Sequence, residues 1–300
     1  MKKVLLLAVA ISLAAGLLVS ASLALAADKK IVVGLALSTL NNPFFVDLRD
    51  GALESAKKEG VTVIVTDAQN DPNKQLSGIE DLVQKHVDLI IINPTDSAAV
   101  VPAIKLANEA KIPVITVDRA AAKGEVVTHI ASDNVAGGRM AGEYLVKLLG
   151  GKGKVVELQG IPGTSAARDR GKGFNEIMAK NPGLQVVARQ EAGFDRAKGM
   201  TVMENILQAQ PQIDAVFAHN DEMALGALKA IEASGRLKIK VIGFDATDDA
   251  VKAVKDGKMA ATVAQQPKEM GRLAIVMAKK VLAGGKIDEF IPVPLSLITK

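Results

Sequence analysis

The sequence contains no cysteine and no tryptophan, and it has only seven Phe and one Tyr. A chain without cysteine has no disulfide bonds and no thiol that could carry a lipid near its N-terminus. Because aromatic side chains are so scarce, any Phe that falls outside a regular apolar stripe is a candidate contact residue.

The sequence also has no large excess of basic over acidic residues. The formal net charge is +4, from 37 Lys and Arg against 33 Asp and Glu. The basic residues are scattered along the chain, and no aromatic residues are interleaved with them to stack on bases. Nucleic acid is therefore not an expected partner.

Metal and nucleotide motifs are missing as well. The three histidines, His86, His129 and His219, are isolated, and no two of them have metal-ligand spacing. The stretch from Asp67 to Gln75 loosely resembles a calcium loop, but Pro72 stands where such loops need Gly, so a loop with a helix N-cap is predicted. No dinucleotide fingerprint, phosphate-binding Lys loop or nucleophile elbow is present. We expect no metal and no cofactor.

The N-terminus has the pattern of a cleavable signal peptide. Lys2 and Lys3 precede an uncharged apolar run from Val4 to about Leu25, and the small residues around Ala26 resemble a cleavage site. A retained membrane anchor is the alternative, because the run approaches the length of a bilayer span. We expect residues 1–26 to be removed and the protein to be periplasmic and not lipidated.

From Lys30 onward, short β-branched runs alternate with helical stretches, which predicts an α/β fold with parallel sheets. The runs are continuously apolar, as in strands that helices cover on both faces. At 300 residues the chain is long enough for two cores. Expected helices include Phe44–Lys58, Ser97–Ala110, Val135–Leu149 and Glu222–Ser234.

An internal repeat supports two similar lobes. The segment IINPTDSAAVVPAIKLANEAKIPVITVD resembles VFAHNDEMALGALKAIEASGRLKIKVIGFD. Asn93 and Asp118 lie 25 residues apart, as do Asn220 and Asp245, and the copies are 127 residues apart. Duplicated polar residues at corresponding strand ends are difficult to explain as independent turns, whereas one shared cleft accounts for all of them.

The side chains at these strand ends suit a monosaccharide, which presents hydroxyl groups that donate and accept hydrogen bonds together with flat C–H faces. Carboxylates would accept from hydroxyls, guanidinium groups would donate, amides would do either, and aromatic rings would cover the sugar ring. The candidates are Asp118, Asp245, Arg119, Arg170, Asn42, Asn93, Asn220, Gln265, Phe44, Phe45 and Phe194.

Each candidate also has a purely structural interpretation. The Phe44-Phe45 pair follows Pro43 and could be ordinary core or a hydrophobic staple. Asn93 and Asp96 could form only a turn and a helix start. The Asp118-Arg119 pair could be a surface ion pair or a loop cap. The repeat favours the binding interpretation for the set as a whole.

The chain resembles the family of bacterial periplasmic D-ribose-binding proteins over essentially its whole length after the N-terminal segment. The resemblance is carried by motifs in both halves: STLNNPFFV, IIINPTDS, IPVITVDR, HIASDN, ELQGIPGTSAARDRGKGF, NDEMALGALKA, VIGFDAT and ATVAQQP. It implies ribose contact through the eleven candidates named above, all of which keep the family's residue type.

The resemblance implies the periplasmic binding protein type I fold, an α/β fold of two Rossmann-like lobes with parallel sheets joined by three crossover hinge segments. It divides the chain into an N-terminal lobe of residues 27–132 plus 266–294 and a C-terminal lobe of 133–265 plus 295–300. Three residues beside the site depart from the family pattern: His219 stands where Gln is expected, Ala246 stands where Gly is expected, and Gln266 follows Gln265. For His219, a position in the cleft and a position at the surface both remain open.

The expected function is capture of a monosaccharide, ribose first, by closure of the two lobes, and delivery to the membrane permease of an ABC importer. The chain is expected to be a monomer, and a chemoreceptor is a further candidate partner. The alternatives are a binding protein for allose, another pentose or a furanose-derived autoinducer, a regulator of the lac-repressor type, and a secreted enzyme using Asp118 and Asp245 as acid and base. No N-terminal helix-turn-helix and no water-activating partner is evident, so neither a regulator nor an enzyme is expected.

Overall fold

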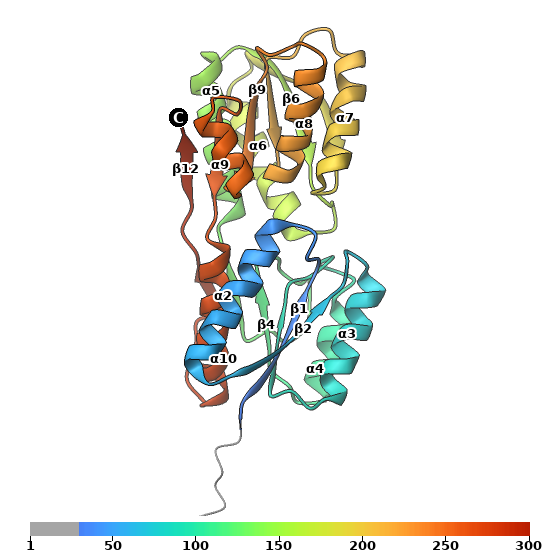
Figure 1. The fold of residues 1–300 in the computed structure, drawn as a ribbon, viewed down its shortest axis with the longest axis vertical. Helices are drawn as coiled ribbons and strands as arrows, with labels where there is room; N and C mark the ends of the chain where they lie inside the picture. Colours follow the sequence, from blue (N-terminus) through green and yellow to red (C-terminus); the bar gives the residue numbers. More distant parts are fainter. Residues whose placement is uncertain (1–29) are drawn as a thin grey trace, which may run out of the picture. The chain divides into compact units, whose positions relative to one another are not determined.

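The computed structural model describes residues 30–300, and its strands form two separate six-stranded sheets (Figure 1). All neighbouring strands are parallel except the antiparallel pair of β10 and β12. In spatial order, the first sheet consists of β11 (Phe290–Pro292), β5 (Thr128–Ala131), β4 (Val114–Val117), β3 (Leu89–Ile92), β1 (Val32–Leu37) and β2 (Thr62–Asp67). The second consists of β12 (Ser296–Thr299), β10 (Ala261–Ala264), β9 (Lys240–Asp245), β8 (Ala215–Ala218), β6 (Gly153–Gln159) and β7 (Leu184–Glu191).

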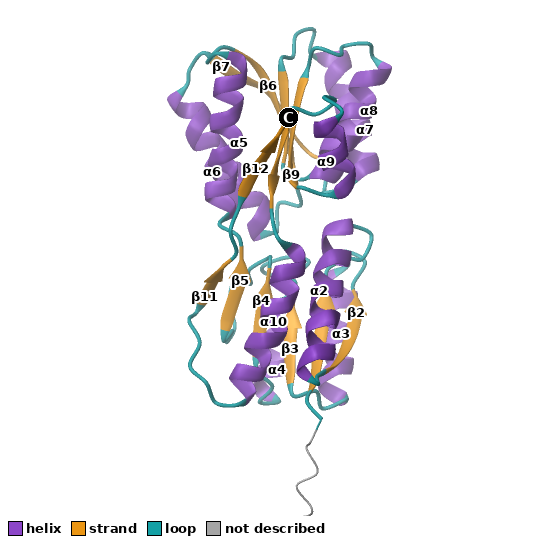
Figure 2. Ribbon diagram, turned by 60° about the vertical axis from the view of Figure 1, so that its left-hand side comes forward, coloured by secondary structure: helices purple, strands orange, loops and turns teal. Residues whose placement is uncertain are grey.

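Helices cover both faces of each sheet (Figure 2). The first sheet and its helices form the N-terminal lobe, in which α2 packs on α10 and α3 packs on α4. The second forms the C-terminal lobe, in which α5 packs on α6 and α7 packs on α8. The helices are α2 (Pro43–Glu59), α3 (Pro72–Gln84), α4 (Val101–Glu109), α10 (Pro267–Leu282), α5 (Asn134–Leu149), α6 (Ser165–Lys180), α7 (Arg196–Ala209), α8 (Asp221–Ala233) and α9 (Asp248–Lys255). The predicted α/β fold with two parallel-sheet lobes is confirmed.

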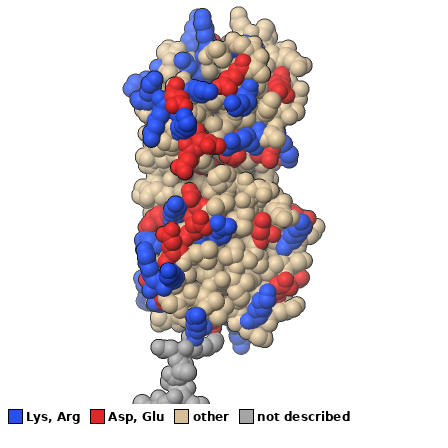
Figure 3. Space-filling view, viewed as in Figure 1, with Lys and Arg blue, Asp and Glu red and all other residues tan. Residues whose placement is uncertain are grey.

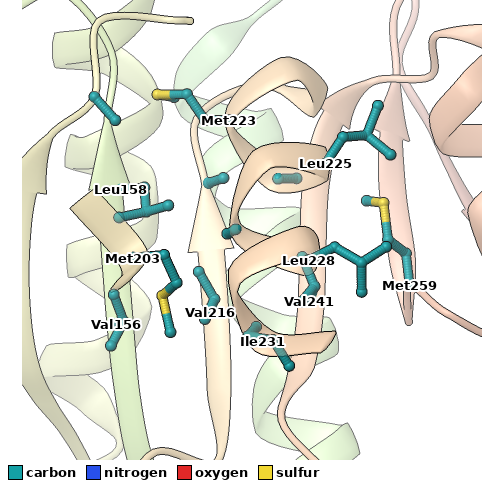
Figure 4. Packing of buried hydrophobic residues seen from close by; sticks show 14 of the residues in the cluster. Val156, Leu158, Met203, Val216, Met223, Leu225, Leu228, Ile231, Val241 and Met259 are labelled. Atoms are coloured by element: carbon teal, nitrogen blue, oxygen red, sulfur yellow. The ribbon is translucent and has the colours of Figure 1, made fainter. Parts of the chain in front are cut away.

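The apolar strands are buried on both faces, as their sequences predict. In β6, Val156 packs in the cluster that includes α7 and α8, while its neighbour Val155 packs in the cluster that includes α5 and α6. Figure 4 shows Val241 of β9 beside Leu228 of α8, in the cluster that also contains Val216 of β8. Successive side chains of a strand point to opposite faces, so each run supplies two cores at once.

Side-chain caps fix where several helices begin. The Asn42 side chain accepts a hydrogen bond from the Phe44 N–H at the start of α2, and Asn220 does the same for Met223 at the start of α8. Asp71 caps α3 through the N–H groups of Asn73 and Lys74, which confirms the loop and N-cap predicted for that stretch.

One predicted helix begins later than expected. Residues 97–100 form turns, and α4 starts only at Val101, with a proline in its first turn. Asp96 accepts hydrogen bonds from the N–H groups of Ala98 and Ala99, and the Ser97 N–H donates to Gly163 of the other lobe. Pro102 suits the first turn of a helix, where its missing N–H would have no partner.

The chain passes between the sheets three times: between β5 and β6, between β10 and β11, and between β11 and β12. The expected division at about Ser132, Gln265 and Pro294 falls within these segments, and the position of the lobe boundaries stays a prediction. The predicted signal peptide lies outside the described residues. No helix among residues 30–300 is long and apolar enough to cross a membrane.

Candidate functional site

A cavity lies where the carboxyl ends of the two sheets face each other, and it comprises about 230 Å³ of space outside the protein atoms, part of which is open to solvent. Nine of the eleven candidates line it, together with Ala166, which the sequence did not single out: Asn42, Phe44, Phe45, Asp118, Arg119, Arg170, Phe194, Asn220 and Asp245. Their strands end at this edge, which is where ligands bind in open parallel sheets.

Three aromatic rings form the apolar part of the cavity wall. Phe44 and Phe45 at the start of α2 are buried and pack edge to face, with ring centroids 5.2 Å apart at 89°. Phe194 comes from the other lobe, after β7. The guanidinium carbon of Arg119 lies 5.0 Å from the centre of the Phe45 ring and 5.3 Å from that of Phe194. Rings and a planar cation thus supply flat surfaces from both lobes.

The N-terminal lobe contributes a buried carboxylate and a buried guanidinium. Asp118 follows β4, and its Oδ2 lies 3.8 Å from Nε of Arg119. Nη1 of Arg119 donates to the Pro94 carbonyl at 3.2 Å, whereas its buried Nε has no hydrogen-bond partner among the described residues. Both side chains are only 4 % exposed, so the surface ion pair considered from the sequence does not apply.

The C-terminal lobe contributes a second pair with more partners. Nη1 of Arg170 on α6 lies 3.4 Å from Oδ1 of Asp245 and donates to the His219 carbonyl at 2.5 Å. Its Nε donates to Oδ1 of Asn134 at 2.8 Å. Arg170 is therefore held at both ends of its guanidinium group before any ligand is bound.

Asn42 and Asn220 act both as helix caps and as cavity walls. Oδ1 of each accepts the N–H bond of its helix at 3.0 Å. Nδ2 of Asn220 donates to the Phe194 carbonyl at 3.3 Å. The turn-and-cap role that is common for asparagine therefore coexists with a place at the cavity.

Asn93 and Gln265 do not line the cavity. Nδ2 of Asn93 donates to Oδ2 of Asp118 at 3.2 Å, and Nε2 of Gln265 donates to Oδ1 of Asp245 at 2.9 Å. Each amide lies against the carboxylate of its own lobe. Asn93 is fully occupied because its Oδ1 accepts from Ser38, while the buried Oε1 of Gln265 has no partner among the described residues.

Strained backbone places the two acids. Asp118 has φ +62° and Asp245 has φ +117°, both in a region that side chains other than Gly rarely adopt. Phe194, at φ +60°, is a third such residue of the cavity wall. Conformations of this kind cost of order 1–3 kcal/mol each and gather at ligand sites. The two copies of the repeat therefore share a positive φ at their corresponding acids, Asp118 and Asp245.

The buried acids are poorly solvated without a ligand. Burial raises the pKa of Asp118 and of Asp245, against the opposing effect of Arg119 and Arg170. Burial likewise lowers the pKa of Arg119 to about 10, although Asp118 acts in the other direction. Hydroxyl groups in the cavity would replace the lost water as hydrogen-bond partners of these charges.

Direct hydrogen bonds join the two lobes beside the cavity. The Ser97 N–H donates to the Gly163 carbonyl at 2.9 Å, and the Ala120 N–H donates to Oγ of Ser165 at 2.8 Å. Nη2 of Arg168 adds a longer bond of 3.3 Å to Oγ of Ser97. These bonds can exist only when the lobes are close together.

His219, whose position the sequence left open, lies neither in the cavity wall nor at the surface. It is 1 % exposed, and its ring lies beneath the cavity against the fully buried Glu157. Sequence reasoning missed Glu157 and Asn134. A charged residue inside the apolar run KVVELQG was the available signal for Glu157.

Charged side chains of the described residues are distributed over both lobes (Figure 3). No group of three or more His, Cys, Asp and Glu could hold a metal ion among residues 30–300. On the face in Figure 3, Lys and Arg alternate with Asp and Glu over both lobes.

A periplasmic binding protein domain model matches residues 33–286. The ribose import binding protein of Salmonella typhimurium is 53% identical over 289 residues, which is 96% of this chain and 97% of the relative. That of Bacillus subtilis is 54% identical, over 91% of this chain and 88% of the relative. A solved solute-binding protein from Actinobacillus succinogenes with bound D-allose superposes with a TM-score of 0.85 at 33% identity, over 90% of this chain and 98% of that one. The chain belongs to the periplasmic binding protein family, here with the type I fold.

Proposed function

We propose that this protein binds D-ribose between its two lobes and delivers it to an ABC importer. The observation that carries the proposal is the set of nine cavity-lining side chains, whose carboxylates, guanidinium groups, amides and rings match the groups of a monosaccharide. The high identity to two ribose import binding proteins favours ribose among the sugars.

Binding is proposed to proceed by hinge closure. The sugar would stabilise the closed form because it contacts both lobes, adding to the hydrogen bonds that already join them. Three or four hydrogen bonds to charged groups, at about 1.5–3 kcal/mol each, would match micromolar binding of about −8 kcal/mol before ordering and closure costs are subtracted. The remaining contacts would serve selectivity, since an epimer leaves a buried partner unpaired.

We also propose export to the periplasm, docking of the closed, loaded form on the importer permease, and release of the sugar without chemical change. Asp118 and Asp245 are each paired with an arginine or an amide of their own lobe, an arrangement that suits binding of hydroxyls. Incubation with labelled ribose should return only ribose, and appearance of any product would contradict the non-enzymatic proposal.

Isothermal titration calorimetry of the purified protein, stripped of ligand by unfolding and refolding, tests the ligand. We expect one-to-one binding of ribose that is tighter than that of allose, galactose, xylose or arabinose. Tighter binding of allose or another pentose would keep the architecture and change the ligand. The bound D-allose in a structural neighbour makes allose the first competitor to include.

A further inference from the structure

His219 makes two hydrogen bonds that fix the protonation of its ring. Nδ1 lies 3.4 Å from the Gly160 backbone nitrogen, and Nε2 lies 3.0 Å from Oε1 of Glu157. A backbone N–H can only donate, so Nδ1 accepts and the hydrogen of a neutral ring sits on Nε2, which donates to Glu157. The two contacts therefore require a neutral histidine in one tautomer.

Glu157 ties the histidine to helix α6. Its carboxylate is fully buried on β6 and accepts from Nδ2 of Asn175 at 3.3 and 3.2 Å and from Nε of Arg189 at 2.8 Å. Nδ2 of Asn175 also donates to the Gly171 carbonyl. A Cβ on Gly171 would lie 3.2 Å from the His219 ring and 3.3 Å from Oε1 of Glu157, so α6 packs directly on this pair.

Three contacts lead from the pair to the cavity wall. The His219 carbonyl accepts from Arg170, and Gly171, which packs on the pair, is the next residue after Arg170. The third contact passes through Gly160, whose N–H donates to His219. The Phe194 ring packs so closely on Gly160 that a Cβ atom on this glycine would lie 2.1 Å from the ring. The Phe194 ring thus rests on backbone that the histidine holds.

We propose that His219 and Glu157 are positioning residues that hold Arg170 and Phe194 in the geometry that binds the sugar. This inference rests on the proposed function for its ligand. Neither side chain lines the cavity, so both act through the residues that do. The pair acts as a neutral donor and a charged acceptor, and each needs the other to stay buried.

The charged groups that face His219 are Glu157 on β6, Arg170 on α6 and, beyond the glutamate, Arg189 on β7. Burial lowers the pKa of His219, against the effect of Glu157, so the neutral ring is the form present at neutral pH. Protonation in acid would place an N–H on Nδ1 opposite the Gly160 N–H. Two donors cannot share a hydrogen bond, so Gly160 and the ring of Phe194 would shift.

Three variants separate positioning from stability. His219→Leu removes both ring hydrogen bonds, His219→Gln keeps an amide that can donate to Glu157, and His129→Leu is the matched control. His129 is a mostly buried histidine of β5 in the N-terminal lobe, 3.0 Å from Oγ1 of Thr116, and it does not line the cavity. Chemical unfolding of all three reports the loss of stability separately.

Calorimetric titration with ribose is the first readout. His219→Leu should weaken binding about fivefold at neutral pH, which is the loss expected for one hydrogen bond, and His129→Leu should not change it. His219→Gln should restore most of the affinity. On acidification the unaltered protein should lose more affinity than His219→Gln, because the histidine ring takes up a proton and the glutamine amide does not. Asp118 and Asp245 are present in both proteins, so their titration contributes equally to both. Equal affinity of His219→Leu and the unaltered protein would overturn the proposal.

A measurement on the protein without sugar tests the positioning role of His219 separately from the proposed binding of ribose. In ¹H–¹⁵N spectra of the unliganded protein, the Gly160 amide and the Arg170 Nε–H signals should move in His219→Leu and stay in place in His129→Leu. If the unaltered protein does not bind ribose, the proposed function fails, and unmoved Gly160 and Arg170 signals would separately refute the positioning role.

Discussion

The two lobes present similar groups to the cavity but support them differently. Behind Asp118, the N-terminal lobe places neutral groups: Asn93 accepts from Ser38 through Oδ1, and its carbonyl accepts from Nε2 of Gln75 at 2.8 Å. Oε1 of Gln75 in turn accepts from the N–H and hydroxyl of Thr95. Amides and hydroxyls do not titrate in the physiological range, so this support is insensitive to pH.

Behind Asp245, the C-terminal lobe places ionisable groups. Besides the His219–Glu157 pair, the fully buried Asp221 accepts from Oγ1 of Thr262 at 2.7 Å and from the Thr247 N–H at 2.8 Å. These bonds hold the loop that carries Asp245 in its strained conformation. The groups that support the site can therefore change protonation in the C-terminal lobe but not in the N-terminal lobe, and the following changes test that difference.

The largest effect is expected from removing the arginines. Arg170→Ala should weaken ribose binding at least about tenfold, because it leaves Asp245 buried without its charged partner. Arg119→Ala should weaken it less, since the Arg119–Asp118 contact of 3.8 Å is longer than the Arg170–Asp245 contact of 3.4 Å. Calorimetric titration of both variants measures the ratio.

A greater loss in Arg119→Ala than in Arg170→Ala would reverse the comparison between the lobes. Circular dichroism and chemical unfolding of both variants serve as the control that each lobe still folds.

A smaller effect is expected on stability from Asp221→Asn. Burial, followed by repulsion from Asp245, raises the pKa of Asp221 well above its ordinary value of 3.8. The folded protein thus keeps a proton that the unfolded chain has lost, and this contribution to stability is present below pH 3.8 and declines as the pH rises through the folded-state pKa. Asparagine imitates the protonated acid, so the variant should lose less stability with rising pH, by up to about 1.4 kcal/mol per pH unit.

Urea unfolding of the unaltered protein and of Asp221→Asn across this pH range measures the difference in slope. Parallel pH profiles would mean that the support of the C-terminal lobe is as insensitive to pH as that of the N-terminal lobe.

The smallest effect is expected where the lobes meet. Ser165→Ala removes the hydroxyl that accepts from the Ala120 N–H, so it should destabilise the closed form and weaken ribose binding about threefold. Ser234→Ala is the matched control, because Ser234 lies in the same lobe and its hydroxyl makes local hydrogen bonds, donating to the Ile231 carbonyl and accepting from the Arg236 N–H. Calorimetric titration compares them, and equal affinity of the two variants would argue that this bond does not contribute to closure.

The fold was predictable because its signals are local. Continuous β-branched runs indicate strands buried on both faces, and the repeat places Asp118 and Asp245 at corresponding strand ends. The identities of the cavity residues followed from the same strand ends, although their roles as ligand contacts stay a prediction.

The features of the site that could not be predicted from the sequence depend on contacts between residues that are distant in the chain. Which amides face the cavity is decided by side-chain packing, so Asn93 and Gln265 could not be separated from Asn42 and Asn220. Likewise His219, the partner of Glu157, lies 62 residues away, directly after β8, a strand that becomes the neighbour of β6 only in the folded sheet.

Every residue that lines the cavity is less than a tenth exposed, and this burial has a kinetic consequence. A sugar enclosed in this way cannot leave through the wall, so its residence time is set by how often the lobes separate. The dissociation rate constant would then follow the opening rate, while association depends on the open form and is nearly unaffected by closed-state contacts. A protein whose affinity is tuned in this manner releases its cargo promptly only when a partner opens it.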